Sequence, residues 1–180
     1  MTENCAIILA GGEGTRMNSS KPKVMAEIIF KPMIDRVIDA VKKAGINDIC
    51  VVTGYKSEIL EKHLDGRTKT VKQAERLGTG HAVMQAKDFI AEHKDANVII
   101  LNGDAPFIDS KTVSDALSYH LDGEFVQTVI SAKTDEPFGY GRIVRDGNGN
   151  FIKIVEEASA DEEIKAINEI NSGGDLNDYL

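Results

Sequence analysis

Hydrophobic residues follow two alternating patterns along the chain. Short apolar runs containing β-branched residues, at 5–9, 49–52 and 98–101, indicate strands that are buried on both faces. Between and after these runs, apolar residues recur at helical spacing and predict helices over 32–44, 57–63, 78–93 and 109–121. Strands that alternate with helices are typical of βαβ units. We therefore predict an α/β fold, with a Rossmann-like, mixed and mostly parallel sheet that carries helices on both faces.

Local signals support the ends of two predicted helices. Pro32 begins the first helix and Gly45 follows its end, as expected for residues that start and stop helices. Asp109 or Ser110 is suited to cap the helix that runs to residue 121. Val71 is expected to lie in a short strand.

The pattern changes after residue 132, where glycine, asparagine and aspartate cluster. A strand is predicted over 125–132, just before this change. The segments 142–144 and 151–155 are expected to pair as a hairpin, because the residues between them suit a turn with positive φ. A polar helix over 161–167 and an extended piece over 169–171 complete the prediction.

Charge and composition narrow the class of protein. Of the 180 residues, 42% are hydrophobic and 28% charged, which is typical of one soluble domain. The 21 basic and 29 acidic residues leave a net charge of -8, which disfavours nucleic acid or an anionic membrane as a partner. Any bound phosphate must therefore meet a local positive site.

No apolar run approaches the ~18 residues that cross a bilayer, so we expect a cytoplasmic protein. Cys5 and Cys50 lie in apolar runs and are predicted to be buried thiols.

A glycine-rich turn, Gly11-Gly12-Glu13-Gly14, directly follows the first predicted strand. Glycines let backbone N–H groups approach an anion closely, and the carboxyl end of a parallel strand is where α/β sheets bind ligands. A tight structural turn would need the same residues. Arg16, Lys21 and Lys23 favour a phosphate-binding loop, because their charges offset an oxygen-rich ligand; the alternative is a solvated basic patch.

Three further positions are candidates for binding chemistry. Asp104 follows the strand at 98–101, where a carboxylate can hold Mg²⁺; the alternative is a loop aspartate that caps local backbone. Gln73 carries two donors and an acceptor on one amide, which suits the edge of a pyrimidine, although such a residue is commonly solvent-facing. Thr79 lies where a helix begins and either faces a base or ribose or acts as an N-cap.

Six motifs together resemble a known enzyme family. They are Leu9-Ala-Gly-Gly-Glu-Gly-Thr-Arg-Met17 with Lys21-Pro-Lys-Val24, Gln73-Ala-Glu-Arg-Leu-Gly-Thr-Gly-His-Ala82, Asn102-Gly-Asp-Ala-Pro106, Gly139-Tyr-Gly-Arg-Ile143, Ile154-Val-Glu156 and Glu169-Ile-Asn-Ser-Gly173. In order and spacing they resemble the sugar-1-phosphate nucleotidylyltransferases, and within these the N-acetylglucosamine-1-phosphate uridylyltransferase domain. The resemblance runs through nearly the whole chain.

The resemblance implies a reaction and a set of site residues. UTP and N-acetylglucosamine 1-phosphate would form UDP-N-acetylglucosamine and pyrophosphate, with Mg²⁺ as cofactor. The implied nucleotide-binding residues are Leu9, Ala10, Gly11, Gly12, Lys23, Gln73, Gly78 and Thr79. Arg16 and Lys23 would stabilise phosphate charge, and Asp104 would bind the metal. Gly141, Glu156 and Asn171 would hold the amino-sugar phosphate, whereas His81 and Glu157 are expected to stay outside the site.

This sequence also departs from the family. Phe30 stands where the family usually has glycine, and Asn102 where relatives often have an aromatic residue. The family takes a second metal ligand, an asparagine, from a segment beyond the 169–173 motif. Residues 1–180 are therefore expected to form a single nucleotidyltransferase domain that is incomplete at its C-terminal end. No hexapeptide repeat is present to build the family's left-handed β-helix, so acetyl transfer is not expected of this chain. The alternatives are a related transferase for another nucleotide or sugar, or a nucleotide-binding domain without turnover. The sequence indicates no oligomeric state.

Overall fold

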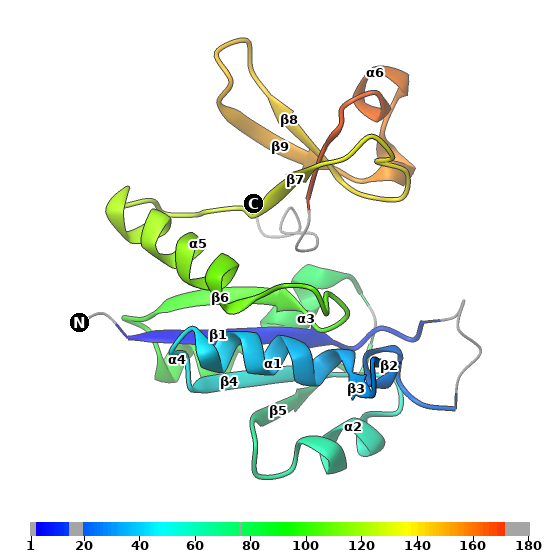
Figure 1. Cartoon of the computed structure of the whole chain (residues 1–180), viewed down its shortest axis with the longest axis vertical. Coiled ribbons are helices and arrows are strands. Elements are labelled where there is room, and N and C mark those ends of the chain that lie inside the picture. Colours follow the sequence, from blue (N-terminus) through cyan, green and yellow to red (C-terminus); the bar gives the residue numbers. More distant parts are fainter. Residues whose placement is uncertain (1–2, 15–19, 76, 172–180) are drawn as a thin grey trace.

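A computed structural model describes residues 3–14, 20–75 and 77–171 and contains a central parallel sheet (Figure 1). Its four strands lie in the order β5 (Lys69–Lys72), β4 (Asp48–Thr53), β1 (Asn4–Ala10) and β6 (Asn97–Asn102), and each neighbouring pair is parallel. The buried strands coincide with the apolar runs of the sequence. The predicted α/β class is therefore confirmed.

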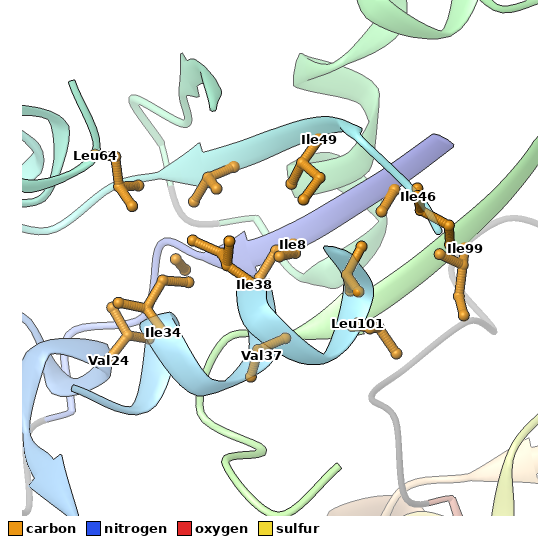
Figure 2. Close-up of a cluster of buried hydrophobic side chains, with 14 of the residues drawn as sticks. Ile8, Val24, Ile34, Val37, Ile38, Ile46, Ile49, Leu64, Ile99 and Leu101 are labelled. Atoms are coloured by element: carbon orange, nitrogen blue, oxygen red, sulfur yellow. The ribbon is translucent and has the colours of Figure 1, made fainter. Parts of the chain in front are cut away.

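Helices cover both faces of this sheet. On one face, α1 (Met33–Lys43), α2 (Ser57–Leu64) and α5 (Ser110–Asp122) pack against alternate strand residues such as Ile8 (Figure 2). On the other face, α3 (Thr79–Gln85) and α4 (Lys87–Glu92) cover the intervening residues, including Ile7. Both sides of each central strand are buried, which is why the strands are apolar at successive positions rather than at alternate ones.

Helix ends agree with the predicted capping residues. Pro32 precedes α1, and Gly45 follows it with φ +88°. Asp109 caps α5, since its side chain accepts a hydrogen bond from the Thr112 N–H at 2.8 Å.

The single helix predicted over 78–93 is wrong, because the chain turns at Ala86 between α3 and α4. The Ala86 N–H donates to the Val83 carbonyl three residues earlier, and this tighter turn leaves Ala86 fully buried.

Residues 131–171 contain a separate antiparallel sheet. Its order is β7 (Ser131–Lys133), β10 (Glu169–Asn171), β8 (Arg142–Arg145) and β9 (Phe151–Val155). The predicted hairpin is confirmed as β8 and β9, joined by a turn in which Asp146 accepts hydrogen bonds from the Asn148 and Asn150 N–H groups. A 3₁₀ helix, η3 (Glu157–Ser159), and α6 (Glu162–Lys165) lead to β10.

The strand predicted over 125–132 is largely wrong. Only the end of that segment enters a strand, as β7, and residues 125–130 are not assigned to a strand. A cavity of about 450 Å³ separates residues 126–130 from the edge strand β6 and is also lined by α5. Apolar and β-branched residues favour a strand only where a neighbour supplies hydrogen bonds, and that neighbour is missing among the described residues.

A small hairpin precedes α1. After the 3₁₀ helix η2 (Lys23–Met25), β2 (Glu27–Ile28) pairs with β3 (Lys31–Pro32), and both turn residues, Ile29 and Phe30, have positive φ. Arg36 on α1 donates to the Ile28 carbonyl at 2.5 Å and holds the hairpin. The turn at Phe30 is thus made by left-handed backbone that glycine adopts more easily. The departure from the family's usual glycine at this position is confined to the hairpin turn.

The two cysteines and the length of the helices were also predicted from the sequence. Cys5 and Cys50 are buried free thiols, as predicted, and burial is the main cause that raises the pKa of each to about 11. Within the described residues, every helix is too short or too polar to cross a bilayer.

Candidate active site

A cleft of about 340 Å³ opens at the carboxyl ends of β1 and β6. It lies where the chain connections leave the sheet in opposite directions, the usual ligand position in open α/β sheets. The cleft brings together these residues predicted from sequence: Leu9, Ala10, Gly11, Gly12, Lys23, Gln73, Gly78, Thr79 and Asp104. Val24, Ala82 and Asn102 complete the lining. Arg16, the remaining predicted phosphate-binding residue, lies outside the described residues.

The glycine loop is fixed by close contact with a second loop. The Tyr55 N–H donates to the Gly11 carbonyl at 3.2 Å, and a Cβ at Gly54 would lie only 2.5 Å from that same carbonyl oxygen. Glycine at position 54 is therefore needed for the two backbones to meet. The sequence prediction missed Gly54. The available signal was its place directly after the β4 strand, at the sheet edge that carries the phosphate loop.

Lys23 and Asp104 form an ion pair inside the cleft. They are 81 residues apart in sequence, yet the Lys23 Nζ lies 2.5 Å from Asp104 Oδ2. Gly14, at φ +61°, packs so closely on the Lys23 side chain that a Cβ there would lie 2.6 Å from the Lys23 Cβ. Because the two side chains are 41% and 35% exposed, the pair stabilises the fold by only about 0–1 kcal/mol. Both groups can therefore exchange partners at small cost.

Gln73 lines the same cleft beside Gly11 and is only 6% exposed, so the solvent-facing alternative is wrong. Its amide nitrogen donates to the Gly78 carbonyl at 3.2 Å and lies 3.1 Å from His81 Nδ1. The His81 ring, which the sequence prediction excluded from the site, thus fixes the Gln73 amide. The N-cap of α3 is Gly78 rather than Thr79, and Thr79 is the first helical residue.

The predicted sugar-phosphate residues come together on the antiparallel sheet, away from the cleft lining. The Asn171 N–H donates to the Gly141 carbonyl at 2.9 Å. A Cβ at Gly141 would lie 2.6 Å from Glu156 Oε1, so a larger residue there would force the Glu156 carboxylate to shift. Asn171 also lines the cavity beside β6, and Asn102 lines both that cavity and the cleft. Asn102 therefore lies between the two groups of predicted residues.

Glu157 differs from its expected solvated role. Arg142 is 1% exposed, and its Nη2 donates to Glu157 Oε2 at 2.7 Å. Burial opposes ionisation of Glu157, but the hydrogen bonds from Arg142 and the Gly139 N–H outweigh it and lower the pKa of Glu157 below its usual value. Glu157 is thus the partner of a buried guanidinium beside Gly141, and removing it would leave that charge uncompensated.

Comparisons with known proteins agree with this architecture. The sequence matches the model of the nucleotidyl transferase family over residues 5–173. It is 46% identical over 171 residues to the bifunctional protein GlmU of Clostridium botulinum (strain Loch Maree / Type A3), covering 94% of this chain and 37% of that protein. GlmU of Thermoanaerobacter pseudethanolicus is 46% identical over 166 residues, covering 92% of this chain and 36% of that protein. This chain therefore spans little more than a third of the length of these curated relatives.

A solved structure shows the same fold. It is a Bacillus anthracis protein, provisionally named a glucose-1-phosphate thymidylyltransferase, in complex with a sucrose. The TM-score is 0.80 at 22% identity, and the match covers 94% of this chain and 69% of that one. Because the family match extends through both the parallel and the antiparallel sheet, this chain belongs to the nucleotidyl transferase family.

Proposed function

We propose that the chain transfers a uridylyl group, forming UDP-N-acetylglucosamine and pyrophosphate from UTP and N-acetylglucosamine 1-phosphate. The observation that carries the proposal is the cleft itself, where the glycine loop, the Lys23 cation and the Asp104 carboxylate face one space. Gln73 and Thr79, which also line the cleft, come from the motif that resembles the uracil-binding segment of the uridylyltransferases. The cytoplasmic location stays a prediction.

The cleft offers complementary groups to each part of UTP. A Cβ at Gly12 would meet no atom within 4 Å, so its backbone is open to an approaching phosphate oxygen. Lys23 supplies a positive charge to the same oxygens in a protein whose net charge is -8. The buried Gln73 amide, fixed by Gly78 and His81, supplies directional hydrogen bonds for the edge of the base.

Asp104 fits a Mg²⁺ ion. Magnesium in nucleotide sites is held by one or two carboxylates, together with water and phosphate oxygens, and Asp104 offers such a carboxylate within the cleft. The ion would supply charge neutralisation to the triphosphate. Lys23, which pairs with Asp104 in this structure, would then be available to the phosphate oxygens.

The proposed chemistry needs no protein nucleophile. An oxygen of the sugar phosphate attacks the α-phosphorus of UTP, and a new phosphorus–oxygen bond forms there. The bond from the α-phosphorus to the bridging oxygen breaks, and its electron pair leaves with pyrophosphate. The residues act by positioning and charge stabilisation. Glu156 would accept hydrogen bonds from sugar hydroxyls, while the Asn171 amide would both donate and accept.

Pyrophosphate release from UTP and N-acetylglucosamine 1-phosphate, measured with the full chain and Mg²⁺, tests the proposal. Lys23→Gln and Asp104→Asn should each lower the rate by roughly 100-fold, as expected for loss of one charge-stabilising group. Lys111→Gln and Asp115→Asn are matched controls, because these two residues pair with each other on the surface of α5. The controls should keep the rate of the unchanged chain.

Three results would contradict the proposal in different ways. Faster release with deoxythymidine triphosphate or glucose 1-phosphate would assign the cleft to another substrate pair. Calorimetric binding of UTP without any release of pyrophosphate would keep the nucleotide assignment and reject the transfer reaction. Equal rates for Asp104→Asn and Asp115→Asn would remove Asp104 from the mechanism.

A further inference from the structure

A second cluster of charged side chains lies at the opposite edge of the parallel sheet. Glu3 precedes β1, Asp48 begins β4 and His93 follows α4. One ligand-type atom from each residue lies within 4.8 Å of the others. Because β1 and β4 are parallel, their amino ends share this edge, while the proposed nucleotide cleft lies at their carboxyl ends.

The His93 ring presents a lone pair to this cluster. Its Nδ1 lies 2.8 Å from the Phe89 carbonyl oxygen, which can only accept a hydrogen bond, so Nδ1 carries a proton. In the neutral ring, Nε2 is then an acceptor, and it faces Asp48 Oδ2 at 3.6 Å, beyond hydrogen-bond distance. The ring is 8% exposed and packs against the Phe89 ring at 4.4 Å between centroids, so its direction is fixed. With the ring neutral, two acceptors therefore face each other, an arrangement that a bound cation would stabilise.

Among the described residues, the lysine on the neighbouring strand is already engaged by another carboxylate. Lys69, which pairs with Cys50 in the sheet, donates to Glu92 at 2.6 Å.

We propose that Glu3, Asp48 and His93 bind a divalent transition-metal ion of the zinc class. One imidazole nitrogen with two carboxylates suits zinc and its neighbours, whereas magnesium and calcium prefer oxygen ligands alone. The hydrogen bond from Nδ1 to a backbone carbonyl is the outer contact that metal-binding histidines usually make. Such an ion would tie the start of β1 to β4 and to the end of α4. The proposal is independent of the reaction in the cleft.

Zinc titration of the full chain, followed by calorimetry and thermal unfolding, tests this site, with Co²⁺ absorption as a spectroscopic probe. We expect binding of one Zn²⁺ and a higher melting temperature than in chelator. Asp48→Asn and His93→Gln should each weaken the affinity at least 10-fold, on the order of the losses seen for metal-site substitutions. The Asp48 side chain is 51% exposed, so its variant should fold even if the change at buried His93 disturbs the core.

Two control variants locate the ion. Glu92→Gln removes an adjacent exposed carboxylate that pairs with Lys69, and Asp104→Asn removes the carboxylate of the cleft. Both should bind Zn²⁺ as the unchanged chain does. The proposal is overturned if Zn²⁺ does not bind, which would mean that a proton bridges His93 and Asp48. It is also overturned if Asp48→Asn binds with full affinity, or if Asp104→Asn abolishes binding.

Discussion

An alanine at position 54 would place a methyl group against the backbone of Gly11. The added carbon would lie 2.5 Å from the Gly11 carbonyl oxygen and 2.7 Å from its Cα, whereas ordinary contacts begin at 3.4 Å. Neither atom belongs to a flexible side chain. Since Gly54 does not have positive φ, alanine is locally allowed, and the perturbation is the collision alone.

The expected effect follows from how far the loop must move. Overpacking of this kind costs about 1–3 kcal/mol, and each kcal/mol lowers the melting temperature of a chain of this size by roughly 2–4 °C. Relief of the collision displaces the Gly11 backbone by roughly 1 Å, a shift that can reduce the rate of a positioned reaction about 100-fold. We therefore expect Gly54→Ala to lose thermal stability and, because Gly11 itself lines the cleft, to lose both UTP affinity and the rate of pyrophosphate release.

Thermal unfolding, UTP calorimetry and pyrophosphate release measure the two effects separately. Gly147→Ala is the matched control, because a Cβ there meets no atom within 4 Å and the residue lies in the β8–β9 turn. Gly12→Ala should keep the stability but weaken UTP binding, since its added methyl would face the cleft. The reasoning is refuted if Gly54→Ala matches Gly147→Ala in both stability and affinity. A less stable Gly54→Ala with normal UTP affinity would separate loop packing from binding.

Two further substitutions test stability alone. Phe30 has φ +61° and is 94% exposed, so Phe30→Gly should raise the free energy of unfolding by about 1 kcal/mol, measured by denaturant unfolding. The control Phe30→Ala keeps the Cβ and should give no such gain. The pKa of Glu169 is lowered from 4.5 to about 2, mainly by the hydrogen bond from Arg145. The ionised Glu169 side chain therefore stabilises the fold above pH 4.5, and this stabilisation is lost as the pH falls toward 2. Urea unfolding should show Glu169→Gln less stable above pH 4.5 and nearly equal to the unchanged chain near pH 2; a constant difference would contradict this.

The sequence was most informative where local pattern and burial agree. The runs that became β1, β4 and β6 are apolar at successive positions because helices cover both faces of the sheet. Carboxyl ends of parallel strands share an edge, so Gly11 and Asp104 could be expected at one cleft although they are distant in sequence. Their placement in one cleft is observed, and their roles in binding stay predictions.

The failures have a common physical origin in tertiary neighbours. The segment 125–130 has the composition of a strand but lies across a cavity from β6 and is assigned to no strand. The turn at Ala86 and the contact between Gly54 and Gly11 depend on what each segment meets in space. Glu157 looked solvated because the buried Arg142 that binds it is 15 residues away in sequence, on β8. Periodicity and propensity contain none of this information.

The division of the site between two sheets has a mechanistic consequence. The phosphate loop, Lys23 and Gln73 are fixed by contacts around the parallel sheet, and each of their described partners lies there. Gly141, Glu156 and Asn171 are fixed by the antiparallel sheet, and the cavity beside β6 lies between Asn171 and that strand. Under the proposed function, nucleotide binding depends on the parallel sheet, whereas transfer also depends on how closely the antiparallel sheet approaches it. If the two sheets moved apart by about 1 Å, we would expect UTP affinity to persist while the rate fell, because a reaction governed by positioning is sensitive to displacements that binding tolerates.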